Sequence, residues 1–384
     1  MSTECKYQQI CGGCPLRNLT EDEYRNLKIT EFKKAMQFIK QTDINFAAPI
    51  FIKDGCRRRA ELAFSMRKGK LILGFNAAQS HEIIDIENCL SLTVQLNNIL
   101  PAIRNFLQIF CNIEQNKKVK NKIQKAAIKN GDICLTKADN GIDILLHVQE
   151  SPGLEHRMEI SDFANNNPDI ARISVSVNKA YPETITEKTK PYIKMGNREV
   201  LIPSGTFLQA SSEGQQALID SVLHYVGESK GNIADLFCGV GTFSYPLSQN
   251  LKNKITAVDS SEELLDGFKQ TINKLMLPNI KIVRKNLFKY PLDAGELKEF
   301  DIIVFDPPRA GAKAQVEQIS AMPTADKPQK IIAVSCNPHT FVNDADTLIE
   351  GGYRIKEITM VDQFVYARHF ELVALFEKNK GETL

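Results

Sequence analysis

The sequence predicts an α/β protein with a mixed, mostly parallel, doubly wound sheet in its C-terminal half and a β-rich α+β region before it. From about residue 231, short apolar runs alternate with helical patterns, which is typical of strands joined by helical crossovers. Upstream stretches such as "AELAFSM" and "GIDILLHVQ" alternate apolar and polar residues, as strands of an antiparallel sheet do. The length of 384 residues allows two or three domains.

The N-terminal half begins with a predicted helix near 21–40, because Thr20 is a good N-cap and apolar spacing continues through "LKITEFKKAMQFI". The lysine-rich stretch 116–125 predicts a mobile loop. We expect three segments. Residues 1–49 hold a cysteine-bearing segment and the helix, 50–195 form a central β-rich domain, and 196–384 form the doubly wound domain.

The C-terminal half predicts five parallel strands, in "NIADLF", "KITAVD", "IKIVRKN", "DIIVFDPP" and "KIIAVSCNP". The last two apolar segments, "RIKEITMVDQF" and "HFELVALFEK", lie close together in the chain. A short connection favours antiparallel pairing, so they predict an antiparallel edge of the sheet.

Composition points to a cytoplasmic protein, which we expect to be a monomer with no membrane association. The N-terminus lacks the apolar core of a signal peptide, and no stretch approaches the length of a membrane span. Nine cysteines, an odd number, fit a reducing compartment better than a disulfide framework. The net charge of +2 is small, but lysine and arginine gather in 53–70 and 117–129, where they could contact phosphate backbones or form a solvated surface.

A glycine turn follows the first strand of the C-terminal half, in "DLFCGVGTF". Gly239 and Gly241 allow a tight turn and a close approach of ligand to backbone. Asp259 ends the next strand about 20 residues later, where an acid can accept hydrogen bonds from ribose hydroxyls. Ser244 occupies the third glycine position of a dinucleotide fingerprint, which favours S-adenosylmethionine as the cofactor.

Two further strands end in residues able to do chemistry. "AVSCNPHTF" places Cys336 where an Asn-Pro turn stops a strand, and "FDPPRAG" presents Asp306 at another strand end. A thiol at a strand end is exposed to a pocket, whereas most thiols are buried as small apolar groups. Arg309 follows the prolines where an amino-methyltransferase would have an aromatic residue, which argues against methylation of an amino group.

These motifs, in this order and spacing and with a downstream His-x-Glu in "HFELVALFEK", resemble the RNA 5-methyluridine methyltransferase family over essentially the whole chain. The resemblance implies a class I, Rossmann-like methyltransferase domain that methylates carbon 5 of uracil. Cys336 would add to ring carbon 6 as the nucleophile, and Glu371 would remove the carbon-5 proton as the base.

The resemblance also implies a set of cofactor contacts at Gln209, Phe237, Gly239, Gly241, Thr242, Asp259, Asn286 and Asp306. The chain departs from the family pattern at Asp259 and Ser211, where Glu and Asn are common. The loop 363–368 lacks the usual Pro and Thr, and we expect this difference to affect the surroundings of the base.

The N-terminal "CKYQQICGGC" has the spacing C-x5-C-x2-C. With one distant cysteine, these residues resemble the family's ligands of a four-iron, four-sulfur cluster, and a zinc site is the main alternative. The implied ligands are Cys5, Cys11, Cys14 and Cys89.

The substrate expected from the resemblance is a uridine flipped out of folded RNA. Candidate RNA contacts are Arg58, Arg59, Lys117 and Lys118. A cluster motif without the small N-terminal TRAM barrel resembles the ribosomal-RNA branch, so 23S rRNA is the first choice and tRNA the alternative. Two other hypotheses are a methyltransferase for another pyrimidine, such as cytosine, and a non-catalytic RNA-binding protein with a degenerate methyltransferase fold.

Overall fold

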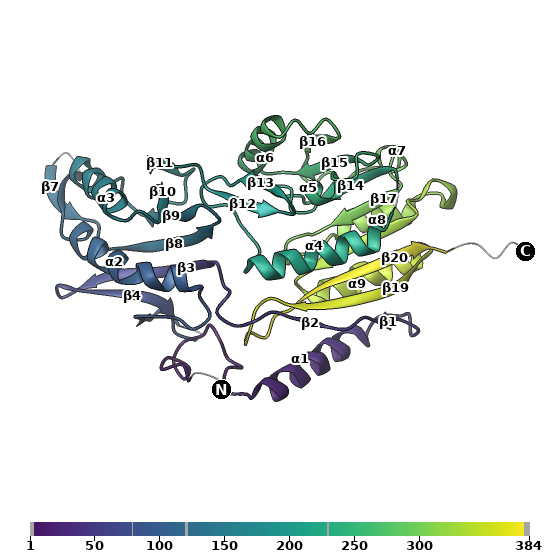
Figure 1. The fold of residues 1–384 in the computed structure, drawn as a ribbon, viewed down its shortest axis with the longest axis horizontal. Coiled ribbons are helices and arrows are strands. Elements are labelled where there is room, and N and C mark those ends of the chain that lie inside the picture. Colours follow the sequence, from purple (N-terminus) through teal and green to yellow (C-terminus); the bar gives the residue numbers. More distant parts are fainter. Residues whose placement is uncertain (1–3, 79, 120–121, 229, 380–384) are drawn as a thin grey trace, which may run out of the picture. The chain divides into compact units, whose positions relative to one another are not determined.

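The computed structural model describes residues 4–78, 80–119, 122–228 and 230–379 (Figure 1). The chain divides into two compact units. The first unit comprises Met1–Asn18, Lys53–Ile193 and Leu201–Ser211, and the second comprises Leu19–Ile52, Lys194–Val200 and Ser212–Leu384. Each unit is therefore built from several separate stretches of the chain.

The second unit contains a nine-stranded mixed sheet in the order β1-β19-β20-β18-β17-β14-β15-β16, with β2 also paired to β19. Five neighbouring strands are parallel, as predicted: β14 (Asn232–Leu236), β15 (Lys254–Asp259), β16 (Ile280–Arg284), β17 (Ile302–Phe305) and β18 (Lys330–Ser335). The last two strands, β19 (Tyr353–Asp362) and β20 (Glu371–Lys378), pair antiparallel, which confirms that part of the prediction. They are not the edge, because β1 (Asn45–Phe46) and β2 (Ile50–Phe51) pair beyond them, parallel to β19.

Helices cover both faces of this sheet. The helices α1 (Glu21–Met36), α8 (Lys313–Ala321) and α9 (Pro338–Glu350) contribute buried side chains to one apolar core with the strands. On the opposite face, α4 (Ser212–Val226) packs across β18, β19 and β20. The remaining helices of the unit are α5 (Ser244–Leu247), α6 (Glu262–Lys274), α7 (Ala294–Leu297) and a 3-10 turn, η1 (Thr324–Asp326).

The N-terminal helix belongs to this second unit, which differs from the predicted division at residues 49 and 195. A capping box between Thr20 and Glu23 starts α1, and the helix ends at Met36, four residues before the predicted end. Phe32 and Met36 lie in the core of the second unit. Burial of these side chains and the pairing of β1 and β2 with β19 explain why residues 19–52 join this unit.

The first unit is β-rich, as predicted. Its seven-stranded sheet has the order β11-β10-β9-β8-β3-β4-β5 and is antiparallel except between β9 and β10. The strands are β3 (Arg59–Arg67), β4 (Lys70–Asn76), β5 (Ile83–Asp85), β8 (Asn130–Ala138), β9 (Gly141–Val148), β10 (Ile170–Val177) and β11 (Glu183–Glu187). Two helices, α2 (Val94–Phe110) and α3 (Leu154–Asn166), complete its apolar core.

The prediction of a loop over 116–125 is wrong for the described backbone. Instead, β6 (Glu114–Val119) and β7 (Lys122–Ala127) form an antiparallel hairpin. A second small hairpin joins β12 (Tyr192–Met195) to β13 (Arg198–Leu201). Strands can pair through their backbones without alternating apolar side chains. The lysine-rich sequence of this stretch therefore gave no indication of strands.

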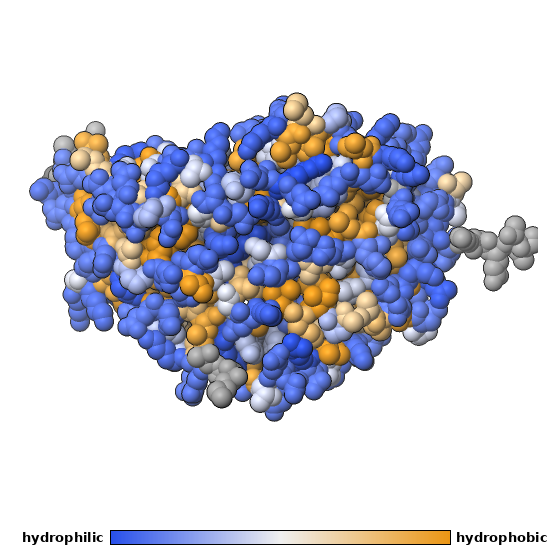
Figure 2. Space-filling model, in the orientation of Figure 1, coloured by the Kyte–Doolittle hydropathy of each residue, from blue (hydrophilic) through white to orange (hydrophobic). Residues whose placement is uncertain are grey.

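The view in Figure 2 shows a mostly hydrophilic surface on which hydrophobic residues form separate patches. In the described part of the chain, no helix combines the length and the apolar character needed to cross a membrane.

Candidate active site

Several residues predicted to bind the cofactor or take part in the reaction lie at the carboxyl ends of the parallel strands in the second unit. Because β14, β15, β17 and β18 are parallel neighbours, their ends meet at one edge of the sheet. The glycine turn follows β14, Asp259 ends β15, Asp306 follows β17 and Cys336 follows β18. Ligands of doubly wound sheets bind beyond such an edge.

The loop that carries Cys336 is held on both sides of the sulfur. Asn337 is the N-cap of α9, and its Oδ1 accepts a hydrogen bond from the backbone N–H of His339 at 3.1 Å. Its Nδ2 donates to the carbonyl oxygen of Arg309 at 2.9 Å. The Ser335 Oγ accepts from the Asn337 N–H at 3.2 Å. These contacts fix the residues before and after Cys336, which is half-buried.

Glu371 lies on the strand next to Cys336. Strands β18 and β20 are antiparallel, and their last paired residues are Ser335 and Leu372. The next residue on each strand is Cys336 and Glu371, so the register brings the predicted nucleophile and the predicted base together. Glu371 is only 4% exposed, and its Oε1 accepts a hydrogen bond from Gln363 Nε2 at 3.2 Å.

Burial at this edge raises the pKa values of three groups, Glu371, Asp306 and Cys336. Burial raises the pKa of Glu371 well above its ordinary value, and the neighbouring charge of Asp306 raises it further. Burial likewise raises the pKa of Asp306 to about 7. The pKa of the Cys336 thiol rises to about 11, first through burial and then through Glu371 and Asp306, while Arg309 opposes the shift. A carboxyl with a raised pKa is suited to proton transfer near neutral pH.

The glycine turn leaves space beside the backbone. Gly239 and Gly241 adopt positive φ angles of 55° and 93°. A β-carbon at Gly239 would meet nothing within 4 Å, whereas one at Gly241 would lie 2.7 Å from the Phe268 ring. Asp259 braces the turn, since its two carboxylate oxygens accept from the backbone N–H groups of Gly239 and Ser261, each at 2.9 Å.

Asp235 is a candidate site residue that sequence reasoning missed. It is fully buried in β14, and its Oδ2 accepts from Ser244 Oγ at 2.5 Å. Its Oδ1 is buried without a hydrogen-bond partner among the described residues, and burial raises its pKa to about 7. An unpartnered buried carboxylate oxygen suits a ligand that carries positive charge. The signal in the sequence is an acid inside the apolar run "NIADLF".

The other predicted cofactor residues divide between the units. Phe237, with φ 60°, packs its ring 5.3 Å from that of Phe288, and Thr242 is half-buried in the same turn. Asn286 Oδ1 accepts from the Phe288 N–H at 3.1 Å, which shapes the loop after β16. Gln209 instead belongs to the first unit, where its carbonyl oxygen accepts from Arg58.

The four predicted cluster cysteines line one cavity of about 580 Å³ in the first unit. All four are free thiols, and the cavity wall also includes Arg17 and Ser91. Cys14 Sγ lies 3.2 Å from Ser91 Oγ, which accepts from Arg17 Nη2 at 2.8 Å. Across the described ranges, no three His, Cys, Asp or Glu side chains converge closely enough to hold a single metal ion. The cysteines are Cys5, Cys11, Cys14 and Cys89.

The predicted RNA contacts have different surroundings in the first unit. Arg58 is 2% exposed and its Nε donates to the Gln209 carbonyl at 3.0 Å, so it has a structural partner there. Arg59 is half-buried, with Nη2 3.7 Å from Cys134 Sγ. Lys117 and Lys118 lie on β6, and their side chains fall outside the described part. Contact of these residues with RNA stays a prediction.

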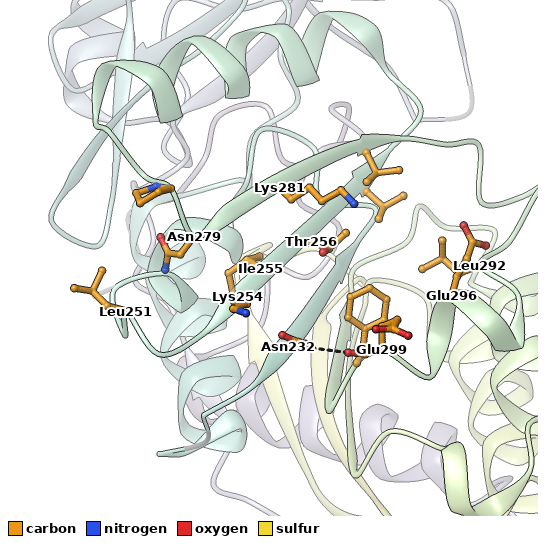
Figure 3. Close-up of a pocket in the computed structure, with 14 residues that line it drawn as sticks. Asn232, Leu251, Lys254, Ile255, Thr256, Asn279, Lys281, Leu292, Glu296 and Glu299 are labelled. Atoms are coloured by element: carbon orange, nitrogen blue, oxygen red, sulfur yellow. Dashed lines mark hydrogen bonds between the residues drawn. The ribbon is translucent and has the colours of Figure 1, made fainter.

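A second cavity, of about 720 Å³, lies along β15 and β16 of the second unit (Figure 3). Its wall includes Asn232 and Lys254 at the amino-terminal ends of their strands, and Asn232 Nδ2 donates to the Glu299 carbonyl at 2.9 Å. None of the predicted site residues lines this cavity.

Comparison with known proteins identifies the class. The family model described as tRNA (uracil-5-)-methyltransferase matches residues 190–379. An RNA methyltransferase of Agrobacterium fabrum is 33% identical over 374 residues, covering 96% of this chain and 82% of the relative. The 23S rRNA (uracil(1939)-C(5))-methyltransferase RlmD of Vibrio parahaemolyticus is 26% identical, covering 98% and 82%.

Among solved structures, the tRNA (uracil-54, C5)-methyltransferase of Pyrococcus abyssi, in complex with S-adenosyl-L-homocysteine, superposes with a TM-score of 0.73 at 22% identity, covering 95% of this chain and 86% of that one. The fold is thus that of the class I S-adenosylmethionine-dependent methyltransferases. The chain belongs to the family of RNA uracil-5 methyltransferases. Family membership makes S-adenosylmethionine the methyl donor and RNA the substrate class.

Proposed function

We propose that this protein methylates carbon 5 of one uridine in RNA, with Cys336 as nucleophile and Glu371 as base. The observation that carries the proposal is the register of β18 and β20, which places these two residues next to each other beyond the Ser335–Leu372 pair. The reaction needs one nucleophile and one base at the same ring, and this edge supplies both.

The proposed chemistry has two stages at the uracil ring. The Cys336 thiolate forms a bond to carbon 6, and the electron pair of the carbon 5–carbon 6 double bond makes carbon 5 nucleophilic. S-adenosylmethionine, when bound, supplies the methyl group to carbon 5. Glu371 then takes the carbon-5 proton, the double bond re-forms, and the bond from carbon 6 to sulfur breaks to release the thiolate.

The glycine turn fits the methyl donor. Gly239 offers open space to a ligand, and Oδ1 of Asp235 is a buried acceptor without a hydrogen-bond partner among the described residues. The proposed cofactor contacts are Phe237, Gly239, Gly241, Thr242, Asp259, Asn286 and Asp306, while the cofactor contact of Gln209 stays a prediction. Asp235 joins this set on the basis of its burial.

We also propose that the four thiols around the first unit's cavity hold a [4Fe-4S] cluster. Cysteine thiolates are ligands of both iron–sulfur clusters and zinc, so zinc is the alternative. The proposal is supported by the position of all four thiols on the wall of one cavity of about 580 Å³. Anaerobic purification should give a brown protein with about four irons, and stoichiometric zinc would contradict the assignment.

The proposed RNA is 23S rRNA, and tRNA is the alternative. The named ribosomal-RNA relative covers nearly the whole chain, whereas the similarity to the tRNA enzyme is one of fold. Arg59 and the lysines of β6 are proposed to hold the backbone. Mapping 5-methyluridine in rRNA and tRNA from cells lacking the gene, with and without the gene restored, would distinguish the two substrates.

A covalent trap tests the nucleophile. RNA that contains 5-fluorouridine should form an adduct with the wild-type protein, because the base cannot remove fluorine and the sulfur bond persists. Cys336→Ala should form no adduct, whereas the control Cys56→Ala, at a thiol outside every motif, should form it normally. Adduct formation by Cys336→Ala would overturn the assignment and indicate another nucleophile, whereas the absence of an adduct with the wild type would favour a non-catalytic RNA-binding role.

A further inference from the structure

The loop that precedes Glu371 is tied to the N-terminal helix of the same unit by a buried lysine. Residues 363–370 connect β19 to β20. Lys28 of α1 is completely buried, and its Nζ donates to the carbonyl oxygens of Ala367 and His369 at 3.0 and 2.5 Å. The same Nζ forms an ion pair of 3.1 Å with Oδ1 of Asp362. One ammonium thus contacts the residue that precedes the loop and two carbonyl oxygens within it.

Tyr24, one helical turn before Lys28, strengthens this connection. Its hydroxyl donates to Oδ2 of Asp362 and accepts from the backbone N–H of Tyr366 at 2.9 Å. The Tyr24 and Tyr366 rings lie 4.8 Å apart. Tyr366 has a φ of 60°, which residues other than glycine seldom adopt. The loop is therefore held in an uncommon conformation by side chains of α1.

Burial of this charged pair has a cost. The buried face of α1 consists of Tyr24, Lys28, Phe32 and Met36, and an apolar residue at position 28 would match its neighbours. Burial lowers the pKa of Lys28 and raises that of Asp362. Replacing a buried ion pair with well-packed apolar residues is often neutral or stabilising. Stability alone therefore gives little reason for a lysine at this position.

The anchored atoms are those that set the position of the base. Asp362 directly precedes Gln363, whose Nε2 donates to Glu371 Oε1 at 3.2 Å. The His369 carbonyl lies two residues before Glu371. Lys28 thus holds the chain on both sides of the Gln363–Glu371 hydrogen bond, at Asp362 and at His369.

We propose that Lys28, together with Tyr24, is a positioning residue for the proton-removal step. It acts by holding loop 363–370 so that Gln363 orients the Glu371 carboxyl. This inference rests on the proposed role of Glu371 as the base. Displacement of a reacting group by about 1 Å can cost on the order of 100-fold in rate, so a small relaxation of the loop is sufficient.

The test separates proton removal from the earlier addition step. The variants are Lys28→Met and Tyr24→Phe, with Lys34→Met on the exposed side of α1 as the matched control. With natural uridine RNA and methyl donor, turnover should fall about 10- to 100-fold in Lys28→Met, and less in Tyr24→Phe. Both variants should accumulate covalent protein–RNA adduct, as Glu371→Gln should, while Lys34→Met should behave like the wild type.

Addition to 5-fluorouridine RNA needs no proton removal, so its rate should stay within about threefold of wild type in both variants. An equal fall in the trapping rate and in turnover would overturn the inference, because it would indicate general damage. Unchanged turnover would overturn it as well. If Glu371→Gln turns over without adduct, the proposed base is wrong, and the Lys28 inference fails with it.

Tyr24→Phe keeps the ring and removes only the hydroxyl, so it decides the matter if Lys28→Met does not fold. A second readout does not depend on catalysis. Hydrogen exchange of the Tyr366 amide should become faster in Tyr24→Phe, because the hydrogen bond to the Tyr24 hydroxyl is lost, and an unchanged exchange rate would contradict the proposed anchoring.

Discussion

The Asn337 side chain joins the loop of the proposed nucleophile to the proline loop, since its Nδ2 donates to the Arg309 carbonyl at 2.9 Å while its Oδ1 caps α9. One residue therefore serves two strand ends, those of β17 and β18, and lies directly after Cys336. The relationship explains how a cysteine on a turn can keep a defined position.

The two roles of Asn337, which caps α9 and bonds to the Arg309 carbonyl, can be separated by substitution. Asn337→Ser keeps a good N-cap but cannot reach the Arg309 carbonyl, so stability should change by only a few tenths of a kcal/mol. Methylation should still fall on the order of 10-fold because Cys336 loses its support. Asn337→Ala should lose about 1 kcal/mol of stability as well. Urea unfolding and initial rates measure the two effects, and full activity of Asn337→Ser would show that the bond to the Arg309 carbonyl is not needed.

Reactivity of the Cys336 thiol should reflect its raised pKa. With a pKa of about 11, the thiolate fraction at pH 8 is on the order of 0.1%, so alkylation should be slow. Its rate should rise about tenfold per pH unit between pH 8 and 10. Glu371 contributes to the raised pKa of Cys336, so Glu371→Gln should lower that pKa and speed the reaction. Peptide mass spectrometry after iodoacetamide treatment measures this site alone, and a rate that levels off near pH 8 would be inconsistent with the assigned pKa.

Glu371 should lower the stability of the fold at neutral and higher pH. Because its pKa is raised on folding, the folded state retains a proton that the unfolded state loses above about pH 4.3. The unfolded state then binds fewer protons, so this group's contribution to stability falls as pH rises toward the folded-state pKa. Glu371→Gln should therefore melt about 2 °C or more above wild type at pH 8, with a smaller difference at pH 5. Scanning calorimetry at both pH values checks this, and an equal or opposite difference would argue against the shift.

The two glycines of the turn should respond differently to alanine. Gly239→Ala places a methyl group in open space, so we expect about 1 kcal/mol of backbone strain and a loss of cofactor affinity of 10-fold or more. Gly241→Ala places it against the Phe268 and Tyr245 rings, at 2.7 and 2.8 Å, and should destabilise the fold by about 2 kcal/mol or more. Calorimetric titration with S-adenosyl-L-homocysteine and thermal unfolding distinguish the two, and normal affinity in Gly239→Ala would place the cofactor elsewhere.

Much of the second unit could be predicted because its signals are local. Apolar runs followed by Gly, Asp or Asn-Pro locate strand ends, and parallel order brings those ends together. The adjacency of Cys336 and Glu371 was not predictable from spacing, since it depends on β20 lying between β18 and β19. Asp235 was not predicted, because a single acidic residue within an apolar run belongs to no repeated pattern in the sequence.

The N-terminal contribution to the second unit was missed for a different reason. Strands β1 and β2 have two residues each and show no periodicity. Their partners lie on β19, more than 300 residues away in sequence (357 − 45 = 312). The sequence did not indicate that Lys28 is buried either, because a lysine in a helix normally faces water.

The placement of α1 has a consequence for biosynthesis. This helix leaves the ribosome early, yet the strand and loop that it packs against, β19 and residues 363–370, are made more than 300 residues later (353 − 36 = 317). At roughly 5–20 residues per second, the helix waits about 15–60 seconds with its apolar stripe uncovered. The second unit can therefore close only when translation is nearly complete, so a chain truncated before β20 would lack the strand that bears the base and expose a surface for chaperones.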